Sequence, residues 1–112
     1  MDERIEKWLY DIKFAVEEIE SYFENNAKTF TNFQQNSMLK RAIERNFEII
    51  GEATKRILDR NPEIEISNAR KIVNLRNLVI HSYDSISDEN IWAIVINGLP
   101  ELKKEVFKLL DL

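Results

Sequence analysis

The chain has 112 residues, 44% of them apolar and 32% charged, with a net charge of −4, two glycines, two prolines, no cysteine and one histidine. A chain of this length folds as one domain, here residues 1–112, and its composition excludes collagen-like, disordered and membrane-spanning classes. The absence of cysteine excludes disulfides, thiolate zinc sites and cysteine nucleophiles, and a lone histidine excludes any site that needs two imidazoles from one copy.

The first predicted helix spans Asp2 to Asn25, where apolar side chains recur three and four residues apart and form one stripe. This N-terminus lacks the basic and then apolar order of a signal peptide, so we expect a soluble, cytoplasmic protein. Asn26 to Asn36 is a polar connection with room for a short helical turn, which Thr29 or Thr31 could cap. A second long helix is predicted from about Ser37 to Asn61, and a proline ends it.

Two further helices are predicted in the second half of the chain. Ser67 or Asn68 can cap the third, which extends to about Ile80. Ser87 can start the fourth, because two acidic residues follow it in a first turn where negative charge is favoured. No segment outside the helical stripes alternates with a period of two, so we expect no strands.

Glycine and proline mark the remaining features. Gly98 and Pro100 indicate either a break before a fifth helix or a kink in one long C-terminal helix. Gly51 lies inside the second helix, where its small size predicts the close approach of a neighbouring helix. The predicted fold class is therefore all-α, a bundle of four or five helices.

The charge is distributed unevenly along the chain. Residues 1–35 sum to −4, residues 36–81 to +3 and residues 82–112 to −3. A positive middle section is what a local anion-binding surface needs, although ordinary helices vary as much.

Arg76 lies in the middle of the apolar stripe of the third predicted helix. With about 100° per residue, five apolar residues of this helix fall within about 60° of it: Ala69, Ile72, Val73, Val79 and Ile80. Because arginine stays charged, it must meet a carboxylate, an interface or a cleft that receives an anion. A buried ion pair with Glu48 or Glu52 is the structural alternative to a functional role.

His81 follows Arg76 by five residues, which on an unbroken helix is a rotation of about 140°. Two geometries can bring both residues into one site. Either the helix loosens near Ile80 and His81 folds back, or two copies of the chain share the cleft.

The pattern of Arg76, His81 and Tyr83 resembles the signature of the HEPN superfamily, and in particular of its HepT-like branch of small helical proteins. Nearly the whole chain shares the resemblance, through RAIERNFEIIGEATKRIL, then NPEI, RNLVIHSYDSIS and IWAIVINGLPEL. The six-residue core from Arg76 to His81 alone is a weak pattern, but behind IIGEA and before an HxY and a tryptophan the pattern is strong.

The resemblance implies a metal-independent ribonuclease that acts as the toxin of a toxin–antitoxin pair. The implied partner is a minimal nucleotidyltransferase of the MntA type, which neutralises such toxins by adenylylating the motif tyrosine, here Tyr83. Members of the superfamily commonly form homodimers in which two motifs line one cleft. Such a dimer would supply the second imidazole.

The chemistry of these residues suits RNA cleavage without a metal or another cofactor. His81 can act as base or acid near neutral pH, and Arg76 can bind two phosphate oxygens at once. Asn77 could hydrogen-bond the phosphate or orient the histidine, and Tyr83 could stack on a base. AMP on Tyr83 would add bulk and negative charge and so repel an RNA phosphate.

Two other functions remain open from the sequence. One is a non-catalytic helical module that binds a nucleotide or a nucleotidyltransferase, and the other is a helical oligomer in which Arg76 forms a buried ion pair. The presence of all three motif residues favours the ribonuclease over the binding module.

Overall fold

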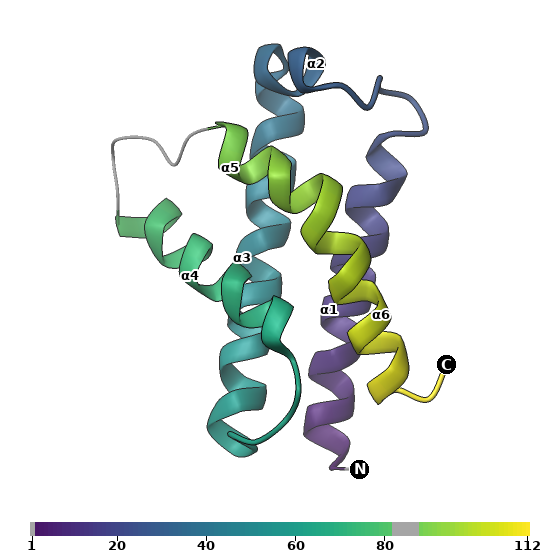
Figure 1. Ribbon diagram of the computed structural model, residues 1–112, viewed down its shortest axis with the longest axis vertical. Coiled ribbons are helices and arrows are strands. Elements are labelled where there is room, and N and C mark those ends of the chain that lie inside the picture. Colours follow the sequence, from purple (N-terminus) through teal and green to yellow (C-terminus); the bar gives the residue numbers. More distant parts are fainter. Residues whose placement is uncertain (1, 82–87) are drawn as a thin grey trace.

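The computed structural model describes residues 2–81 and 88–112, and the side chains of residues 75–81 lie outside this description. The regular elements of the described chain are all helical and form a bundle, which confirms the predicted all-α class (Figure 1). The helices are α1 (Glu3–Tyr22), α2 (Phe30–Gln35), α3 (Ser37–Arg60), α4 (Ser67–His81), α5 (Asp88–Ala93), a π-helical turn η1 (Ile94–Gly98) and α6 (Leu99–Leu109).

The two longest helices, α1 and α3, run antiparallel beside each other (Figure 1). Helix α4 packs against α3, and α6 packs against α1, so the second half of the chain covers the first. One core cluster joins these helices, because each turns an apolar stripe inward. Helix α3 is thus the element that carries α4, the helix with the predicted motif.

Side chains that accept backbone N–H groups fix where the first three helices begin. Oδ1 of Asp2 accepts the N–H of Arg4 at 2.8 Å, Oγ1 of Thr29 caps α2, and Oδ1 of Asn36 caps α3. Asp2 also pairs with Arg60, which ties the start of α1 to the end of α3. Of the two threonines predicted as caps, Thr29 is the one that caps α2.

The predicted cap of the third helix is wrong in its mechanism. Ser67 is the first residue of α4 itself, and Glu105 of α6 binds this helix start from outside. The carboxylate of Glu105 accepts the N–H of Asn68 at 3.4 Å and its side-chain amide at 2.8 Å. A contact over 37 residues replaces the local cap, because an acid from another helix satisfies the same free N–H groups.

The C-terminal segment is one continuous helical stretch with a π-helical turn in it. Residues Ile94 to Gly98 form this turn, and the N–H of Leu99 bonds to the carbonyl of Ile94. The wider turn lies directly before Pro100, whose ring would clash with the preceding turn of a regular α-helix. The break that the sequence left open is therefore absent from the described C-terminal residues.

Aromatic side chains anchor the short helix α2 on the bundle. Phe33 is fully buried, and its ring stacks on that of Trp92 of α5 with centroids 5.3 Å apart. Phe23 meets the same tryptophan edge-on. No helix of the described residues is both long and apolar enough to cross a membrane.

Candidate functional site

Helix α4 carries the predicted motif, and its first half shows which face it turns to the core. Ile66, Ala69 and Ile72 are buried, at the three-residue spacing of one helical face. Position 76 follows position 72 by four residues and so continues the same face along the helix. The described part of α4 thus confirms the start of the apolar stripe, at Ala69 and Ile72, on which the interpretation of Arg76 depends.

The backbone of α4 stays helical as far as His81, its last residue. The predicted alternative in which the helix loosens near Ile80 is therefore wrong for the backbone. Positions 76 and 81 remain about 140° apart around the helix axis. A single α4 thus presents its arginine and histidine positions on different faces.

Of the four predicted site residues, three have a described backbone and one lies outside the described residues. Arg76 and Asn77 lie in the second half of α4 and His81 at its end, with side chains outside the described part of the chain. Tyr83 lies outside the described residues altogether. The roles assigned to these four residues therefore stay predictions.

The first half of α3 contacts the first residue of α5. Nζ of Lys40 lies 3.0 Å from Oδ2 of Asp88, the first residue of α5. One turn further along α3, burial raises the pKa of Glu44 above its ordinary value, although Lys40 and Arg41 favour the charged form. This places a partly buried group of charges next to the start of α5.

The sequence did not reveal this group. Lys40 and Glu44 have the four-residue spacing that is ordinary for exposed helical ion pairs, and Asp88 was interpreted only as a first-turn acid. A contact between residues 48 positions apart has no local signature in the sequence. Only the fold brings the first residue of α5 to α3, where the ion pair joins them.

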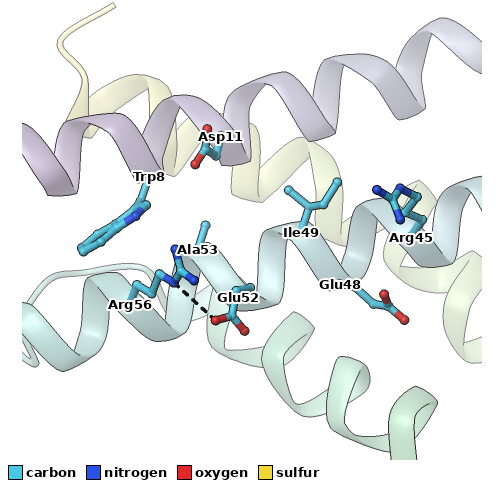
Figure 2. Close-up of a pocket in the computed structure, with 8 residues that line it drawn as sticks. All are labelled: Trp8, Asp11, Arg45, Glu48, Ile49, Glu52, Ala53 and Arg56. Carbon is cyan, nitrogen blue, oxygen red and sulfur yellow. Dashed lines mark hydrogen bonds and ion pairs between the residues drawn. The ribbon is translucent and has the colours of Figure 1, made fainter.

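A shallow depression of about 340 Å³ lies between α1 and α3 (Figure 2). The residues that line it come from α1 and α3: Trp8, Asp11, Arg45, Glu48, Ile49, Glu52, Ala53 and Arg56. Three carboxylates face two arginines here, so the lining carries a formal charge of −1. This balance is unfavourable for a polyanion, and the depression is not the phosphate site that the sequence predicts.

The structural alternative for Arg76 involves two acids of this same surface. Oε1 of Glu52 accepts a hydrogen bond from Nε of Arg56 at 3.3 Å, as the dashed line in Figure 2 marks. Glu48 lies one turn earlier on α3 and is half-buried. An ion pair from Arg76 to either acid would involve a side chain outside the described residues, and it stays a prediction.

Comparison with known proteins identifies the family. Residues 12–109 match the family described as "Ribonuclease HepT-like". This match covers most of the chain, and the protein therefore belongs to the ribonuclease HepT-like family. The HEPN-type resemblance predicted from the motif is confirmed.

Several curated proteins are similar to this chain over nearly its whole length. Two from Methanocaldococcus jannaschii carry the name "Putative RNase": one is 31% identical, covering 95% of this chain and 87% of its own, and the other is 32% identical, covering 91% and 93%. The "Probable ribonuclease HepT" of Thermococcus cleftensis is 32% identical, covering 91% of this chain and 92% of its own. No solved structure matches the chain significantly.

Proposed function

We propose that this protein is a metal-independent endoribonuclease and the toxin of a toxin–antitoxin pair. The observation that carries the proposal is that a member of the ribonuclease HepT-like family has Arg76, His81 and Tyr83 at the positions of the motif. The names of its relatives support a ribonuclease-type function.

The reaction needs little from the protein, because RNA carries its own nucleophile. The 2′-hydroxyl attacks the adjacent phosphorus, the 5′-oxygen of the next nucleotide leaves, and a cyclic phosphate remains. A base must take the hydroxyl proton and an acid must give one to the leaving oxygen, while positive charge stabilises the phosphate. In our proposal His81 transfers protons, Arg76 binds the phosphate oxygens, and Asn77 and Tyr83 position the substrate.

A homodimer with a shared cleft is part of the proposal. One copy holds a single histidine, and base and acid catalysis together call for two proton-transfer groups. The helical backbone of α4 as far as His81 supports this, because positions 76 and 81 occupy different faces of one helix. In a shared cleft the arginine of one protomer would act beside the histidine of its partner.

The proposed antitoxin is a minimal nucleotidyltransferase of the MntA type that transfers AMP to Tyr83. The support for this step is the tyrosine two residues after His81, where the family motif has it. The rival function is a helical module that binds a nucleotide or such a partner without cleaving RNA.

Replacing His81 by alanine tests the proposal against this rival. We expect the parent to cleave single-stranded RNA and His81→Ala to lose this activity, with a change in stability below about 0.5 kcal/mol. Asn74→Ala, at an exposed position of the same helix, is the matched control and should cleave like the parent. In a further arm, the parent incubated with its antitoxin and ATP should carry AMP on Tyr83 by mass spectrometry and lose cleavage.

Equal cleavage by the parent and His81→Ala would rule out the proposed mechanism. A parent that binds the antitoxin but cleaves no RNA would favour the binding module. AMP found only on other residues would contradict the proposed role of Tyr83.

A further inference from the structure

The ion pair between Lys40 and Asp88 joins α3 to the start of α5. Its side chains are 27% and 23% exposed, whereas those of Lys104 and Glu101, an ion pair on α6, are 76% and 57% exposed. An interaction withdrawn from water is screened less by salt and holds its geometry better than a surface pair. The Lys40–Asp88 pair is therefore suited to fix one helix against another.

A third charge lies next to the pair. Glu44 follows Lys40 by one turn on α3, and its electrostatic environment includes Lys40, Arg41, Glu48 and Asp88. Lys40 is thus the cation between two acids, one from its own helix and one from α5. Loss of the lysine charge would leave these acids to repel each other.

The pair lies at one boundary of the proposed catalytic motif. Helix α4 ends at His81 and packs on α3, and α5 begins at Asp88, which Lys40 holds on the same helix. Trp92, one turn into α5, stacks on buried Phe33 and secures the other end of this short helix. Helix α3 therefore packs against the helix that ends at His81 and is tied by this ion pair to the first residue of the helix that begins seven residues later.

We propose that Lys40 and Asp88 are positioning residues of the ribonuclease reaction. By holding the start of α5 on α3, the same helix against which α4 packs, the pair keeps the histidine at the end of α4 in its productive position. This inference rests on the proposed function. Misplacing a catalytic group by about 1 Å can reduce turnover by about 100-fold, so a remote pair can affect the rate strongly.

A direct contact of Lys40 with RNA is the competing explanation, and the two make opposite predictions. If Lys40 bound phosphate, Lys40→Met would weaken RNA binding, while Asp88→Asn would strengthen it by removing a negative charge. If the pair positions the site, both variants should lower kcat and leave KM nearly unchanged. Removal of the positive charge and removal of the negative charge should then lower kcat alike.

The experiment measures kcat and KM for RNA cleavage in Lys40→Met, Asp88→Asn, the double variant and Lys40→Arg. We expect each single variant to lose at least about tenfold in kcat, the double variant to be no worse than either, and Lys40→Arg to retain most activity. The control variants Lys104→Met and Glu101→Gln should match the parent. Faster amide exchange in residues 88–93 of the single variants would report the loosened start of α5.

Parent-like kcat in the single variants, or opposite KM changes in Lys40→Met and Asp88→Asn, would overturn the positioning role. The double variant removes both charges of the pair and keeps the experiment decisive if a single variant fails to fold. A parent that cleaves no RNA contradicts the proposed function itself, whereas an active parent with equally active variants contradicts only this inference.

Discussion

At the scale of single residues, Glu44 shows how the fold alters a side chain near the candidate site. Burial favours its neutral form, and this raises its pKa above the ordinary value of 4.5 despite the nearby Lys40 and Arg41. The folded protein therefore binds this proton more tightly than the unfolded chain does. The resulting contribution to stability is complete below the unfolded pKa and is lost as the pH rises through the folded pKa.

Glu44→Gln should therefore be more stable than the parent at pH 7, because glutamine cannot acquire the buried charge. The advantage should shrink near pH 4, where the parent holds its proton. Urea unfolding at both pH values measures the difference, with exposed Glu63→Gln as the control. An advantage that is equal or larger at pH 4 would contradict the assigned cause.

The motif residues were predicted from the sequence, whereas their supporting residues were not. Arg76 was conspicuous because a charge interrupts an apolar stripe, and the burial of Ala69 and Ile72 confirms the start of that stripe. Lys40 and Asp88 looked like ordinary helical surface residues, and nothing in the sequence indicated that they form a pair. A helical period reports the face of a residue but not its partner on another helix.

At the scale of elements, the sequence predicted those helices that are determined by their own apolar stripe or by a nearby capping side chain. The apolar stripes predicted α1 and α3, and Thr29, which caps α2, was one of the two threonines predicted as possible caps. The start of α4 was predicted with the wrong cap, because Glu105 of another helix replaces it. The π-helical turn before Pro100 was also not predicted, since the sequence fitted a break equally well.

The cap of α3 offers a test at this scale. Oδ1 of Asn36 accepts the N–H of Leu39 at 3.0 Å, so Asn36→Ala should destabilise the fold by about 1 kcal/mol. Asn36→Ser keeps a capping oxygen but, like Asn36→Ala, loses the amide that donates to Asn26. The difference in stability between the two variants therefore isolates the contribution of the cap. Chemical denaturation of the three proteins decides the matter, and equal losses in both variants would contradict the capping role.

At the scale of the whole molecule, α3 contacts both the helix that carries Arg76 and His81 and the first residue of the helix that follows. Helix α4 packs along it, and α5 is tied to it by the Lys40–Asp88 pair. The proposed dimer would add the second histidine that one copy lacks. The proposed reaction depends on positioned side chains and on the 2′-hydroxyl of the substrate.

The measurement that tests this account most directly compares two RNA strands that differ in one atom. One strand is all ribose, and the other lacks the 2′-oxygen at the nucleotide where the first is cut. We predict that the purified protein, in the presence of EDTA, cuts the first strand to a cyclic phosphate end and leaves the second intact. Cleavage of both strands at the same rate, or cleavage that stops when EDTA is added, would contradict the account.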